Sequence, residues 1–375
     1  MWTNLCSILD VSQSFSRPLE SDSNTKTQGA QIVYNNKPFN RNHIVYIKTH
    51  KAASSTIQSM LMRYGMRNNL TFAIPPRNKQ RQVNQLGFPA RFNHIKHMSS
   101  EIEKPDILCY HSVLSTDLIN TMPMDSFYLT SLRDPFSQIK SAYVYYGVGG
   151  HGRKPLMEFL EDGAKSRQVL NNPQSYDLGL SFTRATTEAA IMEGLKAIDS
   201  LFHFVIIVEY FEECLILLRD MMKWTNDDIL YFRVNFNGKS QKTASASPKE
   251  NPQLPSDTPE NRQIVYKYLH ADYIIYSFFK LKVEKIIEQN RDYLDTEIAK
   301  LHELQSTWSN FCLESSAPSS KIKDSRFRTY GVGSYGYILK KQGYLNQTCI
   351  ELACAELHHT KLLADYQARL LSLRL

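Results

Sequence analysis

The sequence has 375 residues, of which 42% are hydrophobic and 22% are charged, and it contains 21 Tyr and 18 Phe. This composition is typical of a globular protein with a sizeable core, and the length fits one large domain or two smaller ones. The formal net charge is +7 and the isoelectric point is near 8.9, which describes a mildly basic surface. Such a surface suits anionic ligands such as nucleotides, acidic glycans or membranes. A solvated surface with a slight excess of Lys and Arg explains the charge equally well.

The cysteine pattern argues against zinc-ribbon and thioredoxin-type motifs, because none of the six cysteines forms a C-x-x-C pair. Cys312, Cys349 and Cys354 lie late in the chain and can form one disulfide in an oxidising compartment. The alternative is that all the cysteines are buried free thiols. Two N-glycosylation sequons, Asn69–Thr71 and Asn346–Thr348, give weak support to a lumenal setting.

The N-terminal segment, residues 1–42, is rich in Ser, Asn and Thr. It contains no apolar run of about 18 residues and no basic-then-apolar signal pattern, so neither a membrane span nor a signal peptide is visible in this chain. We expect this segment to be disordered. One domain is expected to follow over residues 43–375, with its tail from about residue 313 less well defined.

Predicted order begins with a β-branched, apolar strand at His43–Ile47. A small, polar loop follows, and then a helix at Thr56–Tyr64 that Gly65 is expected to end. Strands alternate with helices along the rest of the chain, which predicts an α/β fold with a central, mostly parallel sheet flanked by helices. The remaining elements, in chain order, are strands at Leu70–Ile74 and Arg91–Ile95 around a basic loop at Arg77–Arg81, strands at Asp106–Tyr110 and Ser126–Leu132, a helix at Pro135–Tyr146, a strand at Phe204–Val208, a helix at Phe211–Lys223, long helical stretches within Glu260–Ala299, and a C-terminal amphipathic helix within Glu351–Leu375.

The first segment with chemical meaning is Lys48–Thr56, which lies between the first strand and its helix. Unpaired N–H groups at a helix N-terminus and the helix dipole make such a junction an anion site. Lys51 adds a positive charge, and small residues let a phosphate approach the backbone. The residues expected to surround the anion are Lys51, Ala52, Ala53, Ser54, Ser55 and Thr56. The glycine spacing of a Walker motif is missing, and an ordinary serine-capped helix with a neighbouring lysine remains the alternative.

The second segment begins at Arg133, where the strand Ser126–Leu132 ends and the next helix starts. Arg133 can grip a phosphate bidentately, and Ser141, nearly two turns along the helix, can add a hydroxyl donor. An Arg-Asp-Pro turn with a solvated ion pair is the alternative. Two strand–helix anion sites about 80 residues apart fit a nucleotide that carries phosphates at both its 5′ and 3′ positions.

The two segments around Lys51 and Arg133 resemble those of a known family. The segments KTHKAASST and SLRDPFSQIKSAYVYY resemble the two elements with which Golgi carbohydrate sulfotransferases bind 3′-phosphoadenosine 5′-phosphosulfate (PAPS). The chain is similar to the galactose-3-O-sulfotransferase family, which includes galactosylceramide sulfotransferase. Further similar segments extend the resemblance over roughly residues 40–300, namely IVYIKTHKAASSTIQSMLMRYG with the following NLTFAIP, VIIVEYFEECLILLRDMMKW and DILYFRVN.

The resemblance implies a P-loop-like sulfotransferase fold and PAPS as co-substrate, without a metal. It implies that Lys51 and the segment Ala52–Thr56 hold the 5′-phosphosulfate, and that Arg133 and Ser141 hold the 3′-phosphate. The acceptor would be the 3-hydroxyl of β-galactose on a glycolipid or glycoprotein. Residence in the Golgi and membrane association follow from the family alone, since the membrane anchor typical of the family is not visible in this chain.

His111 is the predicted catalytic base, because it follows a predicted strand where α/β sheets place ligand-binding residues. A histidine near neutral pKa suits removal of a proton from an attacking hydroxyl, and related uronyl 2-O-sulfotransferases carry a histidine after a similar strand. A capping or core histidine is the alternative reading. His50 is the rival base, and Lys48 is a further candidate for contact with donor or acceptor. Two other functions remain open: a P-loop small-molecule kinase, and a catalytically silent glycan-binding relative.

Overall fold

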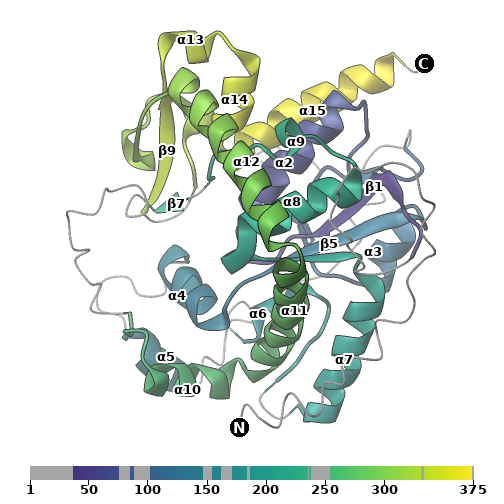
Figure 1. Ribbon diagram of the computed structural model, residues 1–375, viewed down its shortest axis with the longest axis vertical. Helices are drawn as coiled ribbons and strands as arrows, with labels where there is room; N and C mark the ends of the chain where they lie inside the picture. The colour runs from purple at the N-terminus through teal and green to yellow at the C-terminus, as the bar shows by residue number, and fades with distance from the viewer. Residues whose placement is uncertain are drawn as a thin grey trace.

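The computed structural model describes residues 37–75, 85–87, 102–146, 154–161, 171–183, 186–234, 236–237, 254–330 and 333–373. A sheet of four parallel strands lies at its centre, in the order β3-β1-β5-β6. Helices flank this sheet (Figure 1), so the predicted α/β class with a parallel central sheet is confirmed. The strands are β1 (Asn40–Ile47), β3 (Ile107–Leu108), β5 (Ser126–Leu132) and β6 (Phe204–Ile207).

The central strands are buried runs of apolar residues, as a parallel sheet covered on both faces requires. All seven residues of β5 are buried, and the last four of β1 are too. The register pairs Ile47 at the end of β1 with Thr130 near the end of β5. The carboxyl ends of these two strands therefore open at the same edge of the sheet, where open α/β sheets bind their ligands.

The helices that follow these strands begin at this edge. They are α2 (Ser54–Arg67) after β1 and α4 (Pro135–Tyr145) after β5. The predicted helices after β6 and in the long helical region are confirmed as α8 (Phe211–Met222), α10 (Pro259–Tyr268), α11 (His270–Gln289) and α12 (Arg291–Cys312). The remaining helices up to this point are α3 (Thr116–Thr121), α5 (Leu156–Glu161), α6 (Pro173–Asp177), α7 (Glu188–Leu201) and α9 (Asn226–Ile229).

Gly65 does not end the first helix, as the sequence predicted, because α2 continues to Arg67. A Cβ at Gly65 would lie 2.2 Å from the Cζ atom of Phe72, so this glycine permits the close approach of an aromatic ring. The predicted strand at Leu70–Ile74 is also wrong, since Phe72 forms only an isolated bridge with Ile107.

The predicted strand at Asp106–Tyr110 is divided in the structure. Ile107 and Leu108 form β3, and the chain then leaves the main sheet. His111 does not end this strand but begins β4 (His111–Ser112), which pairs in parallel with β2 (Gln85–Gly87) in a separate sheet. The predicted basic loop Arg77–Arg81, the predicted strand Arg91–Ile95 and residues 1–36 lie outside the described residues.

The C-terminal part of the chain contains a sheet of three antiparallel strands in the order β7-β9-β8. A disulfide joins Cys312 to Cys349, which confirms the prediction of one disulfide among the three late cysteines. The third of them, Cys354, is a buried free thiol. The predicted C-terminal helix is confirmed as α15 (Glu356–Ser372), which lies along α2 (Figure 1). The other elements here are β7 (Phe236–Asn237), β8 (Leu313–Pro318), β9 (Ser334–Leu339), α13 (Lys341–Tyr344) and α14 (Gln347–Ala353).

A bilayer crossing would require a long apolar helix, and none occurs in the part of the chain that the structure describes.

Candidate functional site

The loop between β1 and α2 turns its carbonyl groups toward the protein. The carbonyl of His50 accepts a hydrogen bond from Gln138 Nε2 at 3.0 Å, and that of Ala52 accepts one from Ser131 Oγ at 2.8 Å. The carbonyl of Lys51 accepts a hydrogen bond from Arg133 Nη1 at 3.3 Å. The loop is therefore anchored from β5 and α4, the strand and helix of the second predicted segment.

The backbone N–H groups in the second half of the same loop have no hydrogen-bond partner among the described residues. Lys51 and Ala53 adopt left-handed φ angles of 64° and 57°, unusual for residues with a Cβ. Within the described residues, the N–H groups from Lys51 to Ser54 donate no hydrogen bond. Successive N–H groups around left-handed residues form a concave anion-binding nest, and backbone strain of this kind is concentrated at ligand sites. The backbone of this loop therefore has the form of such a nest.

The alternative of an ordinary serine-capped helix is wrong. The N-cap of α2 is Ala53, which supplies no side-chain acceptor, so the first N–H groups of the helix remain available. The hydroxyls of the next residues have protein contacts. Thr56 Oγ1 accepts a hydrogen bond from the N–H of Val234 at 3.2 Å, and Ser55 Oγ donates one to Glu356 at 2.7 Å.

Arg133 lies beside this loop with its backbone clamped by one side chain. Gln174 accepts from the N–H of Arg133 at 2.8 Å and donates to its carbonyl at 2.9 Å. The alternative of an ion pair within the Arg-Asp-Pro turn is wrong, because Asp134 caps α4 through the N–H of Ser137 and pairs with Arg262 at 2.9 Å. The Arg133 guanidinium thus forms no ion pair with its sequence neighbour, although the charges of Glu209 and Asp134 act on it.

Lys51 is the second cation at the loop. Its Nζ lies 3.7 Å from the ring centroid of Tyr145, a cation–π contact with the last residue of α4. Burial, and then the neighbouring charge of Arg133, lower the pKa of Lys51 to about 8. Neither cation forms an ion pair with any described residue. Two half-buried cations that form no ion pair among the described residues, next to a nest of N–H groups, are typical of a site for an anionic ligand.

Ser141 lies half-buried on α4, one turn before Tyr145. Residues four apart on a helix share a face, so Ser141 lies on the side of α4 that meets Lys51 through Tyr145. No hydrogen bond joins Ser141 to Arg133 among the described residues. The two residues thus lie on elements that meet at the loop, but they do not contact each other directly.

The structure brings the predicted base and its rival together. The rings of His50 and His111 stack with centroids 4.1 Å apart and planes inclined by 16°. His111 Nδ1 lies 3.1 Å from the carbonyl oxygen of Lys48, which can only accept, so Nδ1 carries the proton and Nε2 carries a lone pair. Burial, and then the charge of Lys48, lower the pKa of His111 well below its usual value. A neutral imidazole with an unprotonated Nε2 is able to accept a proton.

His50 is held by a carboxylate that the sequence reasoning missed. Asp177 accepts from the backbone N–H of His50 at 2.7 Å and lies 2.8 Å from its Nδ1. Since the carboxylate is an acceptor, it fixes the Nδ1–H tautomer and the orientation of the ring, as the aspartate of a catalytic triad does for its histidine. Asp177 ends the short helix α6, which also supplies Gln174 beneath Arg133.

Helix α6 is itself fixed by a buried carboxylate. Asp272 on α11 accepts from the N–H groups of Gln174 at 3.0 Å and Ser175 at 2.8 Å. Burial raises the pKa of Asp272 to about 6, although hydrogen bonds from Ser175 oppose the shift. The Pro173 start signal could have located α6 in the sequence, but no local pattern reveals that its two ends hold Arg133 and His50.

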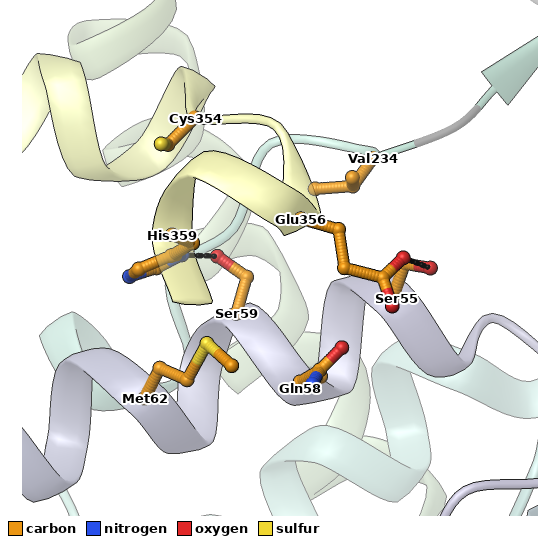
Figure 2. Close-up of a pocket in the computed structure, with 8 residues that line it drawn as sticks. All are labelled: Ser55, Gln58, Ser59, Met62, Val234, Cys354, Glu356 and His359. Atoms are coloured by element: carbon orange, nitrogen blue, oxygen red, sulfur yellow. Dashed lines mark hydrogen bonds between the residues drawn. The ribbon is translucent and has the colours of Figure 1, made fainter. Parts of the chain in front are cut away.

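Lys48, the further candidate for ligand contact, is fully buried instead. Its Nζ donates to Gln58 Oε1 at 2.7 Å and forms an ion pair with Glu356, the first residue of α15. Figure 2 shows Glu356 reaching from α15 to Ser55 on α2. Among the described residues, no group of three or more His, Cys, Asp and Glu side chains could hold a metal ion.

Comparison with known proteins places the chain among sulfotransferases. The galactose-3-O-sulfotransferase family model matches residues 4–367. Galactose-3-O-sulfotransferase 2 of Homo sapiens is 28% identical over 357 residues, which cover 88% of this chain and 83% of that protein. The enzyme of the same name from Sus scrofa is 26% identical, with 87% and 84% covered. Galactosylceramide sulfotransferase of Bos taurus is 28% identical, with 80% and 72% covered.

Proposed function

Because the chain belongs to the galactose-3-O-sulfotransferase family, we propose that it transfers a sulfuryl group from PAPS to the 3-hydroxyl of a β-galactose residue. The observation that carries this proposal is the loop at the end of β1. Among the described residues, the N–H groups from Lys51 to Ser54 have no hydrogen-bond partner, and Lys51 and Arg133 beside them form no ion pair. The stacked rings of His50 and His111 adjoin this loop. A donor that carries anionic groups and an acceptor hydroxyl that must lose a proton require this combination.

The two anionic ends of the donor are assigned to the two strand–helix junctions. Lys51 and the segment Ala52–Thr56 hold the 5′-phosphosulfate, chiefly through the Lys51 ammonium and the backbone N–H groups from Lys51 to Ser54. Arg133 and Ser141 hold the 3′-phosphate from the neighbouring junction. This arrangement of adjacent parallel strands, each followed by an anion site and a helix, fits a P-loop-like sulfotransferase fold over residues 43–375.

The chemistry is a single in-line displacement. The galactose oxygen forms a bond to sulfur while the bond from sulfur to the 5′-phosphate oxygen breaks, and adenosine 3′,5′-bisphosphate leaves. His111 accepts the hydroxyl proton at Nε2, since its Nδ1–H is committed to the Lys48 carbonyl. Lys51 and the N–H groups of the loop stabilise the negative charge that builds on the departing phosphate. No step is assigned to a metal ion.

His50 supports the base in this mechanism. It lies against the His111 ring and is held from behind by Asp177, so it limits the rotation of both rings. Its own Nε2 carries a lone pair for the same tautomeric reason, which makes it the second proton acceptor of the site. Comparing His50→Asn with His111→Asn distinguishes these roles. His111→Asn, which removes the base, should abolish the acidic limb of the plot of kcat against pH. His50→Asn, which removes the supporting ring, should lower kcat but keep that limb.

The acceptor is a galactose-terminated glycolipid or glycoprotein glycan, by analogy with relatives named for galactose and for galactosylceramide. Glycolipid biosynthesis in the lumen of the Golgi, in association with its membrane, is the corresponding setting. The disulfide between Cys312 and Cys349 supports an oxidising compartment of this kind. The kinase alternative is not favoured, since the loop lacks Walker glycines. A silent glycan-binding relative would not need stacked histidines beside two cations that form no ion pair among the described residues.

The test is PAPS-dependent transfer of labelled sulfate to galactose-terminated lipids and glycans, followed by linkage determination of the product. We expect sulfate at the 3-hydroxyl, and we expect Lys51→Ala to abolish transfer while leaving the fold intact. The matched control is Lys267→Ala, which removes an exposed lysine on α10. Titration with ATP–Mg²⁺ and with adenosine 3′,5′-bisphosphate separates the kinase alternative. Full activity in the Lys51 variant, or tight binding of ATP–Mg²⁺ alone, would overturn the proposal.

A further inference from the structure

The donor loop has one contact that comes from the far end of the chain. Glu356, at the start of α15, forms an ion pair with Lys48 and accepts a hydrogen bond from Ser55 Oγ at 2.7 Å. Lys48 immediately follows β1 and Ser55 lies in the first turn of α2, so these residues stand at the two ends of the loop. Figure 2 shows the carboxylate pointing from α15 to α2 at this place.

We propose that Glu356 is a positioning residue for the donor loop, which it holds closed by binding both of its ends at once. This inference rests on the proposed function, because it assigns the loop to PAPS. It adds a carboxylate to the part of the site where cations and N–H donors surround the donor loop. Since this carboxylate is paired with Lys48, its charge is offset, and Lys51 and Arg133 remain the cations available to the donor.

Burial distinguishes this contact from a surface ion pair. The side chain of Lys48 is 0% exposed and that of Glu356 is 13% exposed. Glu356 is the only carboxylate paired with Lys48 among the described residues, and Gln58 supplies a neutral acceptor at 2.7 Å. A buried ammonium needs such a partner, because its solvation by water is lost. The ion pair therefore fixes the position of the Lys48 side chain, which an exposed ion pair would not do.

Lys48 passes this constraint to the histidines. While its side chain is bound to Glu356, its carbonyl oxygen lies 3.1 Å from Nδ1 of His111. The same residue thus joins the C-terminal helix to the proposed base through two well-defined contacts. Displacement of Lys48 would change both the shape of the loop and the orientation of His111.

Glu356 is held in place by the elements around it. It is the first residue of α15, where the helix dipole favours a carboxylate. The preceding N–H, that of Ala355, donates to the carbonyl of Arg326 at 2.8 Å. Near the other end of α15, Gln367 pairs with the backbone of Phe72, accepting at 2.6 Å and donating at 3.2 Å. Helix α15 is therefore docked at both ends.

A double-mutant cycle tests the proposal by binding as well as by activity. The variants are Glu356→Gln, Ser55→Ala and the double variant, and Glu303→Gln on the exposed face of α12 is the matched control. We measure the Kd of adenosine 3′,5′-bisphosphate by calorimetry and the KM for PAPS. Glu356→Gln is expected to weaken both by roughly tenfold, and adding Ser55→Ala should change them by less than about twofold, because the two residues act through one contact.

Several outcomes would overturn the proposal. The first is an affinity of Glu356→Gln for the bisphosphate within about twofold of that of the wild type. The second is that the effects of Glu356→Gln and Ser55→Ala on Kd multiply in the double variant. The third is a decrease in kcat with Kd and KM unchanged. If Glu356→Gln fails to fold, the neutral pair Lys48→Met with Glu356→Gln replaces it. Weak binding of the bisphosphate by that variant would support the proposal. An affinity equal to that of the wild type would overturn it, because Glu356 would then serve only to balance the charge of Lys48. A wild-type protein that binds the bisphosphate without sulfating galactose would refute the proposed function, while the affinity comparison would still decide the role of Glu356.

Discussion

The loss of a proton from Lys51 should set the alkaline limit of activity. Burial and the adjacent Arg133 lower the pKa of Lys51 to about 8, so its ammonium is present at pH 7 and largely absent at pH 9. A lysine with this pKa is about one-tenth protonated one pH unit above it. If only the charged form stabilises the departing phosphate, kcat/KM for PAPS should fall about tenfold between pH 7 and pH 9.

Deprotonation of Lys51 should lower activity but raise the stability of the folded state. These opposite directions make the prediction specific. The folded state releases the Lys51 proton near pH 8, and the unfolded chain keeps it to about pH 10.4. Between these values the unfolded state binds more protons, so this group favours folding more as pH rises. A decline in activity above pH 8 therefore cannot come from unfolding through Lys51.

The assay is initial-rate sulfation at limiting PAPS and saturating acceptor from pH 6 to pH 9.5, with circular dichroism at each pH. Lys51→Arg is the informative variant, because a guanidinium keeps its charge throughout this range but lacks the point-charge geometry of an ammonium. We expect lower activity in this variant, without the decline above pH 8. A flat wild-type profile to pH 9.5, or the same alkaline decline in Lys51→Arg, would refute the assignment of Lys51.

Three further substitutions test the support of the site and the fold. Asp177→Asn should lower kcat about 100-fold, because the histidine it holds loses its tautomeric and electrostatic support; an unchanged kcat at pH 7 would contradict this. Cys349→Ser opens a disulfide to Cys312 across a separation of 37 residues and should lower the free energy of unfolding by about 4 kcal/mol in urea titrations; a loss under 1 kcal/mol would count against a native bridge. Gly65→Ala forces a methyl group to within 2.2 Å of the Phe72 ring and should cost about 1–3 kcal/mol; wild-type stability would mean that the ring moves freely.

The parts of the molecule that were predictable from sequence are those determined by nearby residues. β5 follows from a mostly apolar run of residues, and the helix after it follows from a proline at its start, Pro135. Anion binding by the loop after β1 stays a prediction, which rests on the contiguity of a strand, small residues and a helix in the sequence. The predicted boundaries of helices and strands were wrong where contacts with residues outside the element determine its end. Gly65, for example, resembles a helix stop but instead makes room for Phe72.

The residues that the sequence did not reveal act across long separations. Asp177 lies 127 positions from His50, and Glu356 lies 308 positions from Lys48. The amphipathic pattern of α15 predicts a helix with a buried face, but it does not predict which turn meets α2. Moreover, a carboxylate beside a phosphate site is unfavourable on charge alone. Its place becomes understandable only with Lys48, because the buried ammonium requires an anion and the pair leaves the local charge unchanged. We therefore expect that replacing both members together would disturb the fold less than replacing Glu356 alone, while only the wild-type pair would hold the loop for the donor.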